Sequence, residues 1–179
     1  MLYSVDKQGT AEAEMAAAIS TAARTRMAQM LDSAAYEQQD RRGGQLVVAK
    51  VHLDDHRPSH LEILRIDSIG EVPNGDTQKY TTYALEKMFR LLYGTAIFNH
   101  VYSRQSADEK KGQYPGAIYV ANNGVHYFVS FSGLEAMDDE VLAIASSIDA
   151  GAMTKTALQK IEGLLPNDRW PLYFPDLAA

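Results

Sequence analysis

Residues able to bind a metal ion are densest between positions 52 and 60, where the chain carries His52, Asp54, Asp55, His56 and His60. Two imidazoles and one carboxylate satisfy zinc or ferrous iron. His52, Asp54 and His56 are therefore a candidate metal site, and a metal-dependent enzyme that uses the His52–His60 cluster is one hypothesis for the function. Pro58, however, prevents the helix that would place His56 and His60 on one face, and aspartates beside a proline are also typical of a solvated hairpin turn.

A second candidate site lies on a predicted β-hairpin. Asn123-Gly124 separates two runs of alternating residues, 117–122 and 125–131, and this dipeptide favours a type I′ turn because both turn positions need positive φ. With a two-residue turn, one face of the hairpin carries Ala117, Tyr119, His126, Phe128 and Ser130.

That face combines small residues that leave room, aromatic rings that stack and an imidazole that can ligate a metal centre. We therefore predict that Tyr119, His126, Phe128 and Ser130 bind a planar cofactor. The alternative is that the same face packs under a helix or loop of its own chain, with His126 hydrogen-bonded locally.

The common catalytic signatures are absent, because the sequence contains no Gly-rich phosphate loop, no G-x-S-x-G elbow and no H-E-x-x-H motif. The lack of cysteine also excludes thiol catalysis and iron–sulfur clusters. Ser132 to Glu135 fits a capping box at a helix start, and the acidic residues that follow would repel a phosphate there. We expect a binding role rather than an enzyme.

The composition is that of one globular domain: 179 residues, 46% hydrophobic and 22% charged. The net charge of −6 argues against a nucleic-acid partner. No stretch approaches the length of a membrane span, and the first seven residues lack the features of a secretory signal. We therefore expect a cytoplasmic protein without a membrane partner.

Hydrophobic periodicity and turn signals predict the order α-β-β-α-β-β-α in a single domain spanning residues 1–179. Antiparallel hairpins packed by helices make an α+β fold. The predicted elements are a long helix over about 11–39, strands over 45–53 and 60–69, a helix over 77–93 ended by Gly94, a short strand over 97–102, the hairpin, a helix over 134–149, a last helix over 154–164, and an extended tail rich in proline and aromatic residues over about 166–179.

Two features suggest partners. The long N-terminal helix has a thin, alanine-rich face that allows close helix approach, so we expect a homo-oligomer. The hairpin face or the tail, with Trp170, Tyr173 and Phe174, could instead bind another protein, which is the alternative function to small-molecule binding.

Three segments give the chain a resemblance to the GlcG/HbpS-like family, whose members are haem-binding or haem-degradation-associated proteins of profilin-like fold. The segments are Thr82–Met88, Gly112–Gly116, and Val129–Gly133 together with Asp139–Ala143. The resemblance implies a profilin-like fold and a small-molecule-binding or accessory role, with haem as the cofactor to expect. The family's Arg-Met-Asp-Gly segment is only echoed by Arg65-Ile66-Asp67, and no haem ligand is carried over residue by residue.

Overall fold

The computed structural model describes residues 9–37, 39–162 and 167–178. Three predictions fall partly outside these ranges. They are the reading of the first residues as lacking a secretory signal, the end of the helix predicted over 154–164, and the start of the tail at Pro166.

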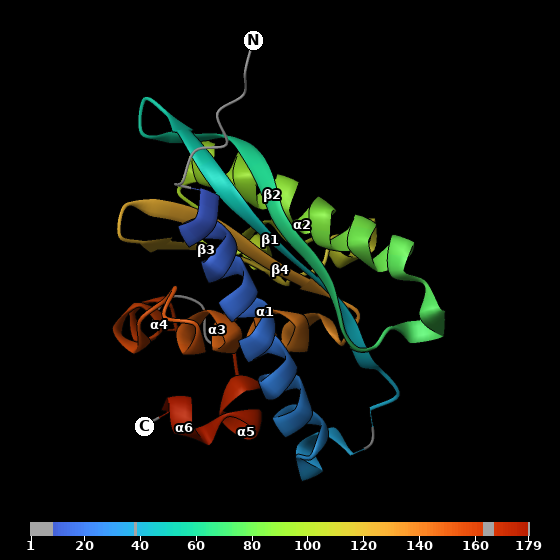
Figure 1. Ribbon diagram of the computed structural model, residues 1–179. Helices are drawn as coiled ribbons and strands as arrows, with labels where there is room; N and C mark the ends of the chain where they lie inside the picture. The colour runs from blue at the N-terminus through green and yellow to red at the C-terminus, as the bar shows by residue number, and fades with distance from the viewer. Residues whose placement is uncertain (1–8, 38, 163–166, 179) are drawn as a thin grey trace.

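One antiparallel sheet of four strands forms the centre of the molecule (Figure 1). Its strands are β1 (Arg42–Asp54), β2 (Arg57–Glu71), β3 (Ala117–Asn122) and β4 (Val125–Ser132). Two hairpins lie side by side in the order β2-β1-β4-β3, with β1 paired to β4. The α+β fold predicted from the sequence is thus confirmed, and it is consistent with a profilin-like arrangement.

The second hairpin has the register that its turn predicts. Asn122 pairs with Val125, Tyr119 with Phe128, and Asn123 and Gly124 both have positive φ. Because side chains alternate along a strand, this register fixes which residues share each face of the sheet.

Helices cover both faces of the sheet (Figure 1). On one face, α1 (Gly9–Leu31) and α3 (Ala136–Asp149) enclose the larger core with Leu46, Val48, Ile118 and Phe131 from the strands. On the other face, α2 (Thr77–Phe98) packs Ala84, Met88 and Leu91 against Val47, Ala49, Ala117 and Phe128. The sheet is therefore the middle of three layers.

The first helix is shorter than predicted: α1 ends at Leu31 rather than near Gln39. Ser33 then caps a short 3-10 turn, accepting a hydrogen bond from the backbone N–H of Ala35 at 3.3 Å. A serine side chain that bonds to nearby backbone competes with helix continuation. The turn buries Tyr36, whose hydroxyl donates to the carbonyl of Arg41 at 2.5 Å.

The prediction that Gly94 ends the second helix is wrong. Gly94 is buried inside α2, which continues to Phe98 and ends at Asn99 in the left-handed conformation. The ring of His100 packs where a Cβ of residue 94 would lie, so the glycine permits a close approach. The strand predicted over 97–102 is reduced to one bridge between Tyr102 and Ile118.

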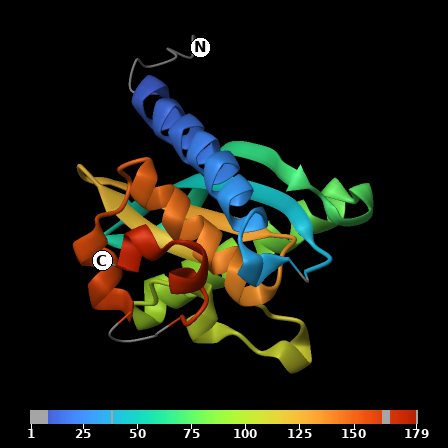
Figure 2. The same ribbon diagram turned by 90° about the horizontal axis from the view of Figure 1, so that it is seen from below.

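The C-terminal part docks on the chain, but it is not extended as predicted. It contains α4 (Lys155–Glu162) and two single-turn helices, α5 (Trp170–Tyr173) and α6 (Pro175–Ala178), which lie near α3 and α1 (Figure 2). Tyr173, Phe174 and Leu177 are buried in the larger core. Proline in the first turn of a helix does not oppose helical φ, and Pro171 and Pro175 are the second residue of α5 and the first residue of α6.

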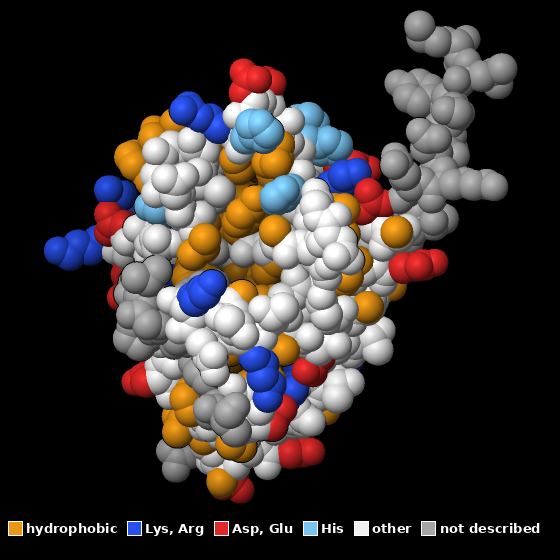
Figure 3. Space-filling view, turned by 90° about the vertical axis from the view of Figure 1, so that its left-hand side faces the viewer, with side chains coloured by type: hydrophobic (Ala, Val, Ile, Leu, Met, Phe, Trp, Pro, Cys, Tyr) orange, Lys and Arg blue, Asp and Glu red, His pale blue; other side chains and the backbone are white. Residues whose placement is uncertain are grey.

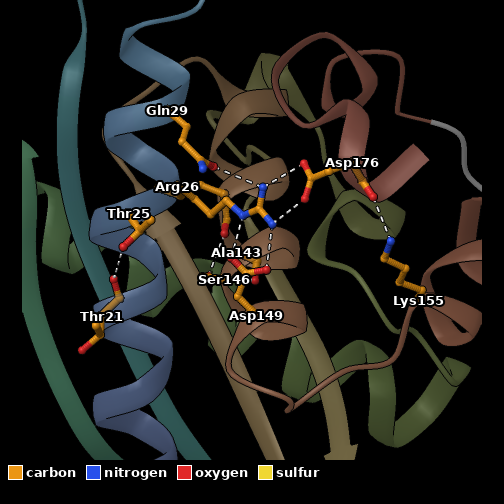
Figure 4. A network of polar contacts seen from close by, with 10 residues as sticks. Thr21, Thr25, Arg26, Gln29, Ala143, Ser146, Asp149, Lys155 and Asp176 are labelled. Atoms are coloured by element: carbon orange, nitrogen blue, oxygen red, sulfur yellow. Dashed lines mark hydrogen bonds and ion pairs between the residues drawn. The ribbon is translucent and has the colours of Figure 1, made fainter. Parts of the chain in front are cut away.

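Arg26 of α1 ties this segment to α1 and α3 (Figure 4). Its guanidinium binds both carboxylate oxygens of Asp149, at 2.6 and 2.7 Å, and both of Asp176, at 3.0 and 2.9 Å. It also lies 5.0 Å from the centre of the Phe174 ring. The two carboxylates raise the pKa of Arg26, so its charge is permanent.

Within the described ranges, none of the helices combines the length and the apolar composition that crossing a bilayer requires.

Replacing Phe174 by alanine should lower the free energy of unfolding by about 3–5 kcal/mol, because the ring is 1% exposed and its loss leaves a cavity beside Arg26. Leu172→Ala is the matched control, since Leu172 is 55% exposed and its loss should change stability by less than about 0.5 kcal/mol. Urea unfolding measures both variants. Equal, small losses would show that the tail does not dock as described.

Candidate functional site

The predicted cofactor face of the second hairpin lies under α2. Ala117, Phe128 and Ser130 are fully buried, and Ala117 and Phe128 belong to the core that α2 closes. The hydroxyl of Ser130 has no hydrogen-bond partner in the described part of the chain. In this conformation a ligand cannot reach these side chains, so the open end of the face, at Tyr119 and His126, is what remains accessible.

Tyr119 and His126 form a pair at that open end. The Tyr119 hydroxyl and Nδ1 of His126 are 2.6 Å apart, and the two rings are nearly parallel with their centres 5.7 Å apart. Burial raises the pKa of Tyr119, so its hydroxyl stays protonated at neutral pH. Because Nδ1 is held by the phenol, Nε2 is the ring nitrogen of His126 that can meet a ligand.

Beside this pair lies a hollow of about 450 Å³, which we call the His hollow. It lies between the end of α2, the β1–β2 turn and β3, and its lining includes His56, Pro58, Ile97, His100, Val101 and Tyr119. Figure 3 shows hydrophobic side chains gathered in a hollow with histidines around it. Pockets of this size bury much of a small ligand.

Sequence reasoning did not identify His100 as a site residue. Between the second helix and the second hairpin the sequence predicted only a short strand over 97–102, without a pairing partner, so nothing placed His100 near Tyr119. Its Nδ1 is buried without a hydrogen-bond partner among the described residues. The one sequence signal was Gly94, whose missing side chain makes room for the His100 ring.

The candidate metal ligands of the first hairpin do not converge. His52 stacks on His60 with ring centres 4.3 Å apart, and its Nε2 is 2.9 Å from a carboxylate oxygen of Glu62. Asp55 and His56 have positive φ in the turn. Over the described ranges, no group of three or more His, Asp or Glu side chains is placed to hold a metal ion, which includes the set His52, Asp54 and His56.

A second hollow, of about 530 Å³, lies at the other end of α2, and we call it the Tyr hollow. Its walls come from Arg41 before β1, the first half of α2, the loop 111–114 and the turn from β4 into α3. Three tyrosines line it, namely Tyr80, Tyr83 and Tyr114, and the side chains of Lys87 and Asp139 contribute to its lining from the interior.

Lys87 and Asp139 form a buried ion pair, with Nζ 2.7 Å from Oδ2 and both side chains 3% exposed. Nζ also donates to the carbonyl of Phe131 at 2.9 Å and to the hydroxyl of Ser132 at 3.3 Å. The other carboxylate oxygen of Asp139 accepts from the backbone N–H of Leu134 at 2.9 Å. This pair joins α2, the end of β4 and α3.

The acidic start of α3 differs from what the sequence suggested. The N-cap is Glu135 without a side-chain cap bond, so the capping box predicted at Ser132 does not form. Asp138, Asp139 and Glu140, the acidic residues expected to repel a phosphate at the helix start, are all buried. Burial raises the pKa of Asp138 to about 6, and it also raises the pKa of Asp139, with Lys87 opposing the shift.

Sequence reasoning did not single out Lys87 either, although a signal was present. Lys87 lies on the same helical stripe as Ala84 and Leu91, which are buried. A charged residue on an apolar stripe indicates a buried ion pair, because an unpaired buried charge is very costly.

Replacing Lys87 by methionine should lower the free energy of unfolding by about 3–5 kcal/mol, since it leaves a buried carboxylate without its cation. Asp139→Asn should also destabilise, whereas the double variant should lose less than the sum of the two, by about 1–3 kcal/mol. Lys79→Met, at an exposed position of the same helix, is the control. Additive losses in a denaturant-unfolding cycle would argue against the ion pair.

Comparisons with known proteins give no relative: no protein-family model, no curated protein and no solved structure matches the chain. The resemblance to the GlcG/HbpS-like family therefore remains a prediction.

Proposed function

We propose that the protein is a small-molecule-binding or accessory domain, without catalysis of its own, that takes a planar ligand in the His hollow. The observation that carries this proposal is the Tyr119–His126 pair beside a hollow of about 450 Å³ whose lining mixes apolar and polar side chains. Aromatic and apolar walls with a few polar groups are typical of ligand sites. We retain the cytoplasm as its expected compartment.

Haem is the planar ligand to test first. His126 is not itself part of the lining of the hollow, but its hydrogen-bond partner Tyr119 is, so the imidazole lies next to the lining. If Nδ1–H of His126 donates to the Tyr119 oxygen, Nε2 carries the lone pair that an iron ion needs. Apolar groups from Pro58, Ala96, Ile97 and Val101 suit the face of a porphyrin. His126 would then be the residue that holds the iron of a bound haem.

The other functions considered for this sequence have less support. The hairpin face is largely covered by α2, and the aromatic residues Tyr173 and Phe174 of the tail are buried in the chain's own core. Neither is therefore free for a protein partner in this conformation. A metal-dependent enzyme at His52, Asp54 and His56 has no converging ligand set over the described residues.

Titration with haem should give a Soret band that saturates at one haem per chain. His126→Ala should weaken binding at least about tenfold, equal to about 1.4 kcal/mol, because it removes the imidazole that would hold the haem iron. His60→Ala is the control: His60 is stacked on His52, and both pair across β1 and β2 outside the lining of the hollow.

Melting temperatures separate a binding role from a packing role. An unchanged haem affinity in the His126 variant, with or without a lower melting temperature, would contradict the site assignment.

Self-association is part of the proposal, but through another helix than the sequence suggested. The apolar stripe of α1, with Ile19, Ala23 and Met27, is buried in the chain's own core. On α2, by contrast, Phe89, Tyr93 and Ile97 recur every fourth residue and are 55–65% exposed. Exposed apolar surface of this kind is typical of protein contacts, and a second copy would cover it.

Light scattering should therefore give a mass of at least twice 19.8 kDa at micromolar concentration. Phe89→Ser combined with Tyr93→Ser should shift the mass toward the monomer, while Thr82→Ala at the exposed start of the helix should leave it unchanged. A monomeric wild-type chain would remove self-association from the proposal.

A further inference from the structure

One wall of the Tyr hollow is aromatic. Tyr83 and Tyr114 are each nearly half exposed, so their rings border the open part of the hollow, while Tyr80 and Leu134 are buried in its wall. With a volume of about 530 Å³, the hollow is large enough for a small aromatic molecule. An aromatic ring that enters it would cover the two half-exposed tyrosines.

The charges around the Tyr hollow nearly balance, except for one lysine. Lys87 is paired with Asp139, as described above, and Lys111 with Asp108 at 2.8 Å. The remaining pairs are Arg41 with Glu135 at 3.7 Å and Arg90 with Glu86 at 3.0 Å.

Lys79 is the exception, because its ammonium group has no carboxylate partner in the described part of the chain. The group lies 5.5 Å from the ring centre of Tyr80 and 5.9 Å from that of Tyr83. One uncompensated positive charge thus lies beside the aromatic wall of a chain whose net charge is −6.

The interior end of the hollow offers a hydrogen-bond donor rather than a charge. All three hydrogens of the Lys87 ammonium have acceptors, and the two carboxylate oxygens of Asp139 accept from Lys87 and Leu134. The Ser132 hydroxyl accepts from Lys87, and none of the described residues takes its own hydrogen. A polar oxygen of a ligand could therefore accept that hydrogen.

We propose that the Tyr hollow is a second binding site, which takes a small planar aromatic monocarboxylate. Its ring packs against Tyr83 and Tyr114, and its carboxylate meets Lys79 at the mouth. A group with two or more negative charges fits less well, because Glu86 and Glu135 lie on the same wall. A cation is excluded by Lys79 itself.

The first test compares two probes of the same ring and different charge, 1-naphthoate and 1-naphthamide, by isothermal titration calorimetry. Naphthoate should bind one per chain, and the neutral amide should bind about tenfold more weakly because it loses the charge-assisted contact. Added salt should weaken naphthoate binding and leave the amide unchanged. Equal affinities for the two probes, or no heat with either, would overturn the proposal.

Variants then locate the site. Lys79→Gln should weaken naphthoate binding about fivefold, as expected for an exposed charge, and Tyr83→Leu should weaken both probes. Lys110→Gln is the control, since it removes the same charge from an exposed residue that does not line the hollow. An equal loss in the Lys79 and Lys110 variants would show that net charge, rather than the hollow, attracts the probe.

The two sites can fail independently. Lys79→Gln should not change the haem titration, and His126→Ala should not change naphthoate binding. Lys79 lines the Tyr hollow, whereas His126 contacts Tyr119 of the His hollow at the opposite end of α2. If naphthoate binding instead responds to His126→Ala and not to Lys79→Gln, the aromatic ligand occupies the His hollow and the second site is refuted.

Discussion

The position of α2 on the sheet depends on one buried ammonium group. Lys87 gives its three hydrogens to the Phe131 carbonyl, the Ser132 hydroxyl and the Asp139 carboxylate, so α2, β4 and α3 meet at a single atom. Space for that atom is limited: a Cβ at Gly116 would lie 2.8 Å from Nζ of Lys87 and 2.9 Å from Cβ of Asp139. A glycine at φ +132° is thus required beside the pair. A buried ion pair that lacks one of its partners is costly, so α2, β4 and α3 must pack together for the contacts of Lys87 to form.

The two hollows follow from this anchoring of α2. The helix is fixed to β4 and α3 near its middle by Lys87 and packs Ala84, Met88 and Leu91 on the sheet, so its two ends extend past the closely packed region. At the N-terminal end, the loop 111–114 and the start of α3 complete a hollow with tyrosines and cations. At the C-terminal end, Gly94 lets His100 fold back, and the β1–β2 turn closes the His hollow. One helix therefore lies between two hollows with different lining residues, which is why two chemically different ligands are proposed.

Local signals in the sequence were sufficient for the sheet but not for the helix ends or the site. Asn123-Gly124 determines the hairpin register because few residue pairs accept two positive φ values, so the face with Tyr119 and His126 was predicted correctly. What covers that face depends on where α2 packs, and a pattern along one helix does not contain this information. Gly94 illustrates the same point: glycine usually ends a helix, but a distant contact with His100 gives it another use here. The metal site expected at His52, Asp54 and His56 was inferred because these residues are close in the sequence. Among the described residues, the turn does not bring their ligating atoms together.

The C-terminal segment shows why contacts between residues far apart in the sequence could not be predicted. Hydrophobic burial of Phe174 and Leu177 favours docking, yet apolar contact is not directional and does not choose one position on α1 and α3. Arg26 makes that choice, because a planar guanidinium with two bidentate carboxylates accepts only one arrangement of Asp149 and Asp176. Its partners lie 123 and 150 residues away in the chain. Ion pairs between residues so far apart produce no periodic pattern in the sequence from which they could be predicted. The buried acids of α3 act in the same way with Lys87 and Arg104, which pair with Asp139 and Glu140. In this fold, then, apolar periodicity determines which faces are buried, and single buried cations determine which segments meet there.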